Sequence, residues 1–183
     1  TYDALDLIDP KSVLTNTVPV IKESEHYFFK LNELQTFLKT NIQHISRQIP
    51  IKAKLDEWLD KDLKDWDVSR DEPYFGFNIP GETTKYIYVW MDAPVGYLAS
   101  IKNWSNKNKI DFEELINKED VKLVHFIGKD IVYFHLLFWP AMLKTFDINN
   151  LDEVFVHGFL TIEGNKMSKS KGNFILADNA LKY

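Results

Sequence analysis

Residues Lys122–Ile162 read KLVHFIGKDIVYFHLLFWPAMLKTFDINNLDEVFVHGFLTI, and this stretch decides the expected fold. Lys122 to Ile127 is an apolar, strand-like run that Gly128-Lys129-Asp130 ends. Ile131 to Phe146 has the length and composition of a helix, and Val154 to Ile162 is the next strand. A strand, a long helix and a second strand predict a parallel crossover unit, and such units are right-handed in about 98% of cases.

The expected helix carries two features that bear on function. Pro140 lies inside it and predicts a kink near Leu136, because proline cannot donate a backbone hydrogen bond. Ile131, His135 and Trp139 are spaced four residues apart and share one face. From the pattern alone such an aromatic stripe is more often core than pocket. Here, however, the face begins one residue after Asp130, so part of it should look into a cleft.

In open α/β sheets, ligands bind beyond the carboxyl ends of the strands. Tyr86 to Met91 is β-branched and aromatic throughout, which predicts a strand buried on both faces. Three groups of polar or glycine-containing residues then follow expected strands: Asp92–Pro94, Gly128–Asp130 and the loop from Gly164. We therefore expect all three to meet at one rim.

The remaining elements are expected to be short. The first are a strand over His26 to Leu31 and a helix capped by Asn32, with Leu34, Phe37, Leu38 and Ile42 on its apolar stripe. A second amphipathic helix over residues 51–64 follows, and then an extended piece from Trp66 to Arg70 and a strand over Tyr74 to Ile79. The last are a helix through Tyr97, Leu98 and Ile101 and a short helix around Phe112 to Ile116.

Composition limits the class of protein. The 183 residues are 45% hydrophobic, which suits one or two packed domains and is too apolar for disorder. The net charge of -5 means that any contact with nucleic acid must be local or supplied by other parts. The chain has no cysteine, so it forms no disulfide or thiolate metal site. The sequence has no run of about 18 apolar residues, so no membrane span is predicted.

A lysine-rich loop follows the last strand. Lys166-Met167-Ser168-Lys169-Ser170-Lys171 lies between Gly164 and Gly172, and the glycines allow the loop to bend. Lysine is a compact charge on a flexible stem that suits phosphate oxygens. The loop could therefore close over a triphosphate, and the alternative is a solvated basic loop.

Lys166 to Ser170 is letter for letter the second signature of the class I aminoacyl-tRNA synthetases. Further stretches resemble the methionyl-tRNA synthetases in particular. These are Tyr88-Val89-Trp90-Met91-Asp92-Ala93-Pro94, Phe126 to His135 and Val156-His157-Gly158, with Asp6 to Ser12 near the start. The resemblance extends over essentially the whole chain.

The resemblance implies an α/β fold. Residues 1–65 would be the C-terminal part of a connective insert, and residues 66–183 the second half of a Rossmann-type catalytic domain with parallel strands, ending in the KMSKS loop and a truncated helix. The other class I signature, His-x-Gly-His, does not occur in the chain. The sequence therefore reads as a piece of a longer protein, and we expect the piece alone to be inactive.

The resemblance also assigns roles to residues. ATP would meet Gly128, Asp130, His157, Lys166 and Lys169, with Lys166 and Lys169 as the catalytic, charge-stabilising pair. Methionine would meet Trp90, Ala93, Pro94, Tyr97, Ile131, His135, Phe138 and Trp139. From the residues alone, Asp130 could instead cap a helix. Arg70 is a candidate on the substrate side, and its alternative is an ion pair with Asp67 or Asp71. Asn78 departs from the family, which often has a carboxylate there.

By the same resemblance, the longer protein is expected to be a methionine–tRNA ligase of the cytoplasm or an organelle. Its partners would be methionine, Mg-ATP and methionine tRNA, with no membrane. His26 and His44 have no cysteine partners, so no metal ligand is expected in this chain, and any zinc knuckle would lie before Thr1. Two alternatives remain open: a non-catalytic relative that binds RNA or protein, and another nucleotidyl transferase with a lysine-rich loop. The sequence leaves the oligomeric state open.

Overall fold

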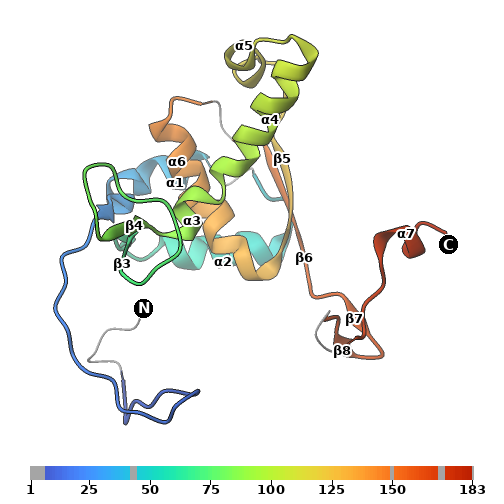
Figure 1. Ribbon diagram of the computed structural model, residues 1–183. Helices are drawn as coiled ribbons and strands as arrows, with labels where there is room; N and C mark the ends of the chain where they lie inside the picture. Colours follow the sequence, from blue (N-terminus) through green and yellow to red (C-terminus); the bar gives the residue numbers. More distant parts are fainter. Residues whose placement is uncertain (1–6, 42–44, 149–150, 169–171, 183) are drawn as a thin grey trace.

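The structure is a computed structural model that describes residues 7–41, 45–148, 151–168 and 172–182 (Figure 1). Its centre is a parallel pair of strands, β5 (Val124–Gly128) and β6 (Glu153–His157). Val124 lies opposite Glu153 and Gly128 lies opposite His157, so both strands end at the same level. The predicted strand–helix–strand crossover is confirmed.

The connection between these strands is helical but not one continuous α-helix. It consists of a 3₁₀ turn, η3 (Lys129–Ile131), a π-helical segment, η4 (Phe134–Phe138), and α6 (Trp139–Thr145). The Trp139 N–H donates to the Phe134 carbonyl five residues back, which closes the wide π turn. The kink that Pro140 predicts near Leu136 falls inside this π segment, so the distortion takes the form of a wide turn.

Residues 28–41 and 45–59 pack against the crossover. It contains β1 (Phe28–Phe29), a 3₁₀ turn η2 (Leu31–Leu34), α1 (Gln35–Asn41) and α2 (Ile49–Leu59). Leu38, Leu55 and Leu59 are buried between these helices and the crossover. The prediction that Asn32 caps the first helix is wrong, because the turn begins one residue earlier, at Leu31, and no side chain caps it. The second helix begins and ends earlier than the expected 51–64.

The outer edge of β6 is closed by the segment that leads into α2. The Val154 N–H donates to the Ile45 carbonyl at 2.8 Å. The side-chain amide of Gln48 then takes the place of a peptide group. Its Nε2 donates to the Val156 carbonyl at 2.8 Å, and its Oε1 accepts from the Val156 N–H at 2.7 Å. This edge of the strand therefore keeps its backbone groups paired.

The middle of the chain holds two small antiparallel pairings and three helices. The strands are β2 (Trp66–Asp67), which pairs with β1, and β3 (Ser69–Asp71), which pairs with β4 (Lys85–Ile87). The helices are α3 (Val89–Asp92), α4 (Val95–Asn108) and α5 (Phe112–Ile116), and the last confirms its prediction. In place of the expected strand over Tyr74 to Ile79 there is a single bridge between Asn78 and Tyr86.

The predicted buried strand over Tyr86 to Met91 is wrong. The strand β4 ends at Ile87, and the chain then turns into α3, where the Ala93 N–H donates to the Val89 carbonyl. The physical reason is that a short apolar run fits a buried strand and a helix turn equally well by periodicity. Asp92–Pro94 consequently lies at a junction between two helices, not at the end of a strand.

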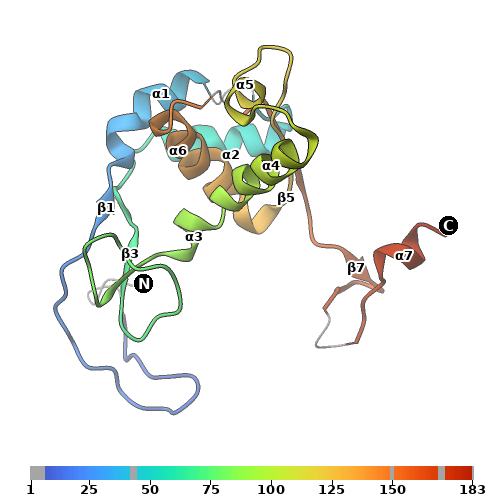
Figure 2. The ribbon, with the colours of Figure 1, turned by 45° about the horizontal axis from the view of Figure 1, so that its top comes forward.

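The chain beyond β6 leaves the helical body in both Figure 1 and Figure 2. The expected strand over Val154 to Ile162 is interrupted after His157, and a hairpin follows. The hairpin consists of β7 (Thr161–Ile162) and β8 (Asn165–Lys166), and α7 (Ala177–Ala180) comes last. Glu163 and Gly164 both have positive φ, as a tight two-residue hairpin turn requires. In the part of the chain that the structure describes, no helix is long and apolar enough to cross a membrane.

Candidate active site

A cavity of about 230 Å³ lies beyond the carboxyl ends of β5 and β6. Its walls come from the turn after β5, the end of β6 and the hairpin that follows. The lining residues are Gly128, Asp130, His157, Gly158, Phe159, Leu160, Lys166 and Met167. Four of the five residues that the sequence assigns to ATP therefore meet at one opening. The fifth, Lys169, lies outside the described residues.

Gly128 and His157 face each other across the paired strand ends. A side-chain carbon added at Gly128 would lie 3.9 Å from His157 Cε1, so the glycine leaves open the space directly in front of the histidine. His157 Nδ1 lies 2.8 Å from the Gly158 carbonyl, which can only accept, so this nitrogen carries the hydrogen. His157 Nε2 is then left to meet a ligand.

Asp130 lies in the 3₁₀ turn η3, and its side chain is exposed. The alternative role, a helix cap, is not what the structure shows. Gly128 occupies the cap position of η3, Tyr133 occupies that of η4, and neither turn has a side-chain cap. Asp130 is exposed and lines the cavity, where its carboxylate can accept hydrogen bonds from hydroxyl groups.

Two lysines share one aromatic ring at this cavity. Lys166 Nζ lies 3.8 Å from the centre of the Phe159 ring, and Lys129 Nζ lies 4.4 Å from the same centre. Both distances are within the range of cation–π attraction. Neither lysine forms an ion pair within the described residues. The site therefore has an excess of positive charge available to an anion.

A second group of aromatic residues comes from α4 and from the helical connection between β5 and β6. Tyr97 of α4 meets His135 and Trp139 there, with ring centres 5.8 and 6.1 Å from its own. His135 Nδ1 lies 3.0 Å from the Ile131 carbonyl and must be its donor, so the neutral ring accepts at Nε2. The Tyr97 hydroxyl lies 3.0 Å from that Nε2 and donates to it. His135 and Trp139 are fully buried, as the core alternative for this stripe requires, and the opening of part of the face into a cleft stays a prediction.

His125 of β5 completes this group, although it was not among the predicted site residues. Trp139 Nε1 donates to His125 Nε2 at 3.2 Å, and the His125 and His135 rings lie 5.6 Å apart. Burial, together with the charge that a protonated His135 would carry, lowers the pKa of His125 to about 4. Burial also lowers the pKa of His135, against the opposing effect of its bond to the Ile131 carbonyl. Both rings are therefore neutral near pH 7.

Trp90 and Phe138 belong to a third aromatic group. Trp90 of α3 stacks on Phe134 with ring centres 4.4 Å apart, and Phe138 stacks on Trp66 at 3.9 Å. Phe134 and Phe138 in turn lie 5.5 Å apart. Of the predicted methionine residues, Tyr97, Ile131, His135 and Trp139 are thus in direct contact, while Trp90 and Phe138 contact each other through Phe134. Phe134 was not predicted as a site residue.

Ala93 and Pro94 form the joint between α3 and α4, where Pro94 is buried and Ala93 is exposed. Arg70 lies away from the cavity beside β5 and β6. Its guanidinium group stacks over the Tyr88 ring at 3.8 Å, and its Nη1 pairs with Asp67 Oδ2 at 3.2 Å. The ion pair with Asp67, one of the two alternatives given by the sequence, is confirmed.

His26, Asp67 and Ser69 form a cluster that has the composition of a nucleophilic triad but not its geometry. Asp67 Oδ1 and Ser69 Oγ each lie 3.1 Å from the same His26 nitrogen, Nδ1. A triad requires the serine and the aspartate on opposite ring nitrogens. Ser69 is also fully buried. Within the described ranges, no three His, Asp or Glu side chains converge as metal ligands.

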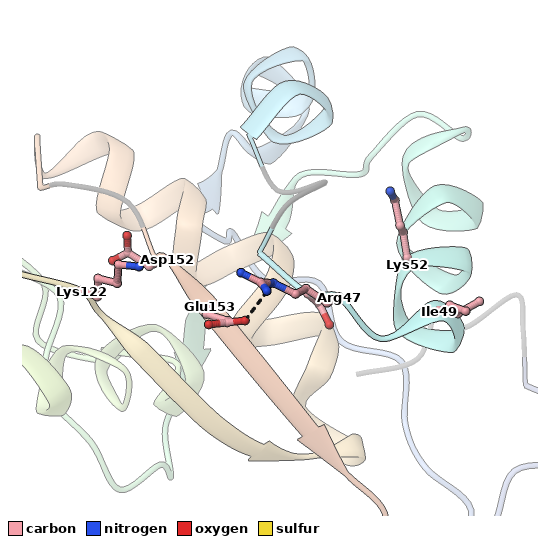
Figure 3. A pocket seen from close by; sticks show the side chains of 7 residues that line it. Arg47, Ile49, Lys52, Lys122, Asp152 and Glu153 are labelled. Atoms are coloured by element: carbon pink, nitrogen blue, oxygen red, sulfur yellow. Dashed lines mark ion pairs between the residues drawn. The ribbon is translucent and has the colours of Figure 1, made fainter.

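A larger cavity, of about 620 Å³, lies at the other end of the strands, between the start of α2 and the start of β6 (Figure 3). Arg47 Nε pairs with Glu153 Oε1 at 3.3 Å across it. Asp152 Oδ2 is occupied by the Leu123 N–H at 2.6 Å. The position of this cavity is opposite to the end at which parallel sheets bind ligands.

A parallel strand pair with a helical crossover places the chain among the α/β proteins, whose open sheets bind ligands beyond the carboxyl ends of the strands. The family model described as "tRNA synthetases class I (M)" matches residues 1–183. The chain therefore belongs to the class I tRNA synthetase family that this model describes.

Solved structures of methionyl-tRNA synthetase from Mycobacterium tuberculosis are similar to this chain. A complex with methionyl-adenylate is 30% identical, with a TM-score of 0.70 over 93% of this chain and 33% of that chain. A second structure bound by methionyl-adenylate is 28% identical, with a TM-score of 0.69 over 90% of this chain and 32% of that chain. The apo form is 26% identical, with a TM-score of 0.65 over 81% of this chain and 30% of that chain. The chain thus spans about a third of the length of these relatives.

Proposed function

We propose that this chain is part of a methionine–tRNA ligase. The observation that carries the proposal is the meeting of Gly128, Asp130, His157 and Lys166 at one cavity beyond the carboxyl ends of β5 and β6. The family match over the whole chain and the similarity to structures bound by methionyl-adenylate support the choice of reaction.

In the proposed first step, a carboxylate oxygen of methionine attacks the α-phosphorus of ATP. The new bond joins that oxygen to phosphorus, the bond between the α-phosphorus and the bridging oxygen breaks, and pyrophosphate leaves with the electron pair. No general base is needed, because the carboxylate is already ionised near pH 7. The protein has to position the reactants and to stabilise the developing negative charge.

The proposed roles follow from where each side chain lies. Asp130 accepts hydrogen bonds from the ribose hydroxyls, and Gly128 allows the nucleotide to approach the backbone. His157 faces the phosphates through Nε2. Lys166 stabilises charge on the phosphates as they separate, and so does Lys169, whose role rests on the family signature. ATP enters as its magnesium complex, in which the metal belongs to the substrate.

The aromatic groups behind the cavity are proposed to receive the methionine side chain. Tyr97, His135 and Trp139 offer rings and one donor–acceptor pair, and thioether sulfur packs favourably against rings. The stacked pair of Trp90 and Phe134 forms a further apolar wall. Burial keeps His135 neutral, so the pocket presents no charge to a neutral side chain.

The whole reaction requires more than this chain, which spans a third of its solved relatives. We propose that residues 1–65 close a connective insert and that residues 66–183 form the second half of the catalytic domain. The first half of the ATP site, the contacts to methionine tRNA and any zinc knuckle would lie in other parts of the protein.

The test is methionine-dependent ATP–pyrophosphate exchange by the full-length protein that contains this chain. Lys169→Ala should reduce the exchange by two orders of magnitude or more, because one well-placed charge-stabilising donor is worth roughly 3 kcal/mol of barrier. Lys166→Ala should reduce it less. Lys122→Ala, a lysine at the opposite strand end, is the matched control and should leave exchange unchanged.

Wild-type protein that binds no methionine in calorimetry would point to another nucleotidyl transferase. Protein that binds methionine and ATP but catalyses no exchange would point to a non-catalytic relative. Either result, or full exchange by Lys169→Ala, would refute the proposal as stated.

A further inference from the structure

The cavity contains a residue whose role nothing in the family signatures marks. Phe159 lies between the end of β6 and the hairpin strand β7, and its side chain is 42% exposed. Two ammonium groups lie over its ring, with Lys129 Nζ at 4.4 Å and Lys166 Nζ at 3.8 Å from the ring centre.

These two lysines come from separate parts of the fold. Lys129 is the first residue after β5, in the turn that also contains Asp130, and Lys166 is on β8, directly before the remainder of the lysine-rich loop. The ring therefore lies between the proposed ribose turn and the hairpin that leads into the proposed phosphate loop. Both faces of a phenyl ring carry partial negative charge, so one ring can attract more than one cation.

The contact with the ring also leaves the two lysines able to bind an anion. An ammonium group has three hydrogen-bond donors, and the ring attracts the charge without accepting all of them. A free lysine loses considerable side-chain freedom when a ligand immobilises it. Two lysines that already rest on a ring at the cavity wall lose less of that freedom, so an anion arriving there meets charges that are partly pre-positioned.

We propose that Phe159 is a positioning residue for the phosphates of ATP, and that Lys129 is a second phosphate-binding lysine held by the same ring as Lys166. The proposal rests on the proposed function, in which ATP occupies this cavity. It adds one binding residue, Lys129, and a physical connection between the ribose turn and the hairpin.

The experiment measures the Kd for ATP by calorimetry and the KM values for ATP and methionine in exchange, all with the full-length protein. Phe159→Leu keeps an apolar side chain but removes the ring. It should raise the Kd for ATP roughly 5- to 30-fold, the combined effect of two exposed cation–π contacts. The KM for methionine should stay within twofold. Phe159→Trp keeps an aromatic face and should stay within twofold for both ligands.

Lys129→Met, which keeps the stem and removes the charge, should also weaken ATP binding. If Phe159 acts on ATP by holding Lys129, the double variant should be weaker than wild type by less than the product of the two single effects. Phe75→Leu, at a fully exposed phenylalanine outside the cavity, is the matched control and should change nothing.

Three results would overturn the inference: an unchanged or lower Kd for ATP in Phe159→Leu, an equal loss in Phe159→Trp, or strictly multiplicative effects of Phe159→Leu and Lys129→Met. If wild-type protein binds ATP but shows no exchange, the proposed reaction fails while the calorimetric comparison still decides the role of Phe159. Wild-type protein that does not bind ATP overturns both.

Discussion

Lowering the pH from 7 to 5 should destabilise the protein through His125. The groups that face this ring are Tyr97, with ring centres 4.9 Å apart, His135 at 5.6 Å, and the Trp139 N–H, which donates to Nε2 at 3.2 Å. Protonation of Nε2 would remove the acceptor of that bond and would place a charge in a buried aromatic group. The folded protein therefore resists a proton that the unfolded chain accepts.

The size of the effect follows from the two pKa values. The pKa of His125 is about 4 in the folded protein and 6.5 in an ordinary environment. Between these values the unfolded state binds more protons, so stability is fully present above about pH 6.5 and is lost as the pH falls toward 4. The loss between pH 7 and pH 5 is roughly 2 kcal/mol by linkage. The lowered pKa of His135 acts in the same direction.

Urea denaturation at pH 7 and at pH 5 measures this loss. In His125→Gln the amide oxygen can still accept from Trp139 but does not titrate in this range. The variant should therefore lose at least 1 kcal/mol less than wild type over the same interval. Phe75→Leu, at a fully exposed residue that does not titrate, should lose as much as wild type. Equal losses in wild type and His125→Gln would show that His125 does not carry the pH dependence.

Two further predictions concern the strand pair. Gln48→Leu removes both bonds to the Val156 backbone and should lower the free energy of unfolding by about 1–3 kcal/mol. Gln48→Glu keeps the acceptor and should lose less stability. Urea denaturation that finds the two variants equally stable would contradict this. Gly128→Ala should melt normally, because its new carbon would lie 3.9 Å from His157 Cε1, yet it should raise the Kd for ATP about tenfold. Unchanged ATP binding in calorimetry would argue against a nucleotide over this glycine.

The parallel pair was predictable because its signals are local and agree with one another. An apolar run, a Gly128 break, a helix-length segment and a second apolar run leave few arrangements open, and β5 and β6 lie as expected. The strand expected over Tyr86 to Met91 failed for the opposite reason. Its residues are apolar without a period, and only contacts made elsewhere, such as the Val89 N–H donating to the Tyr74 hydroxyl, decide where the strand ends.

The candidate site likewise contains residues that the sequence could place and residues that it could not. Gly128–Asp130 and the loop from Gly164 were expected at one rim from their positions after strands, and the resemblance added His157. Gly128, Asp130, His157 and Lys166 do line one cavity. Asp92–Pro94, expected at the same rim, follows a helix and does not line this cavity. His125 offered no such signal. Its strand neighbours Val124 and Phe126 are apolar but exposed, while His125 and Ile127 are buried, so the inward face of β5 is decided by packing and not by the apolar pattern. Phe159 offered no signal, because its neighbours Lys129 and Lys166 are distant in sequence and meet it only in three dimensions.

The wide turn at Phe134–Phe138 makes the crossover tolerant of a change in length. It holds one residue more than an α-helical turn, and the Trp139 N–H still reaches the Phe134 carbonyl one turn back. A deletion in ordinary α-helix rotates everything after it by about 100°. A deletion within this segment would instead let the same two groups close an α-helical turn, so Trp139 would keep its place beside Tyr97 and His125. Loss of one residue here should therefore be less damaging than the same loss within α4.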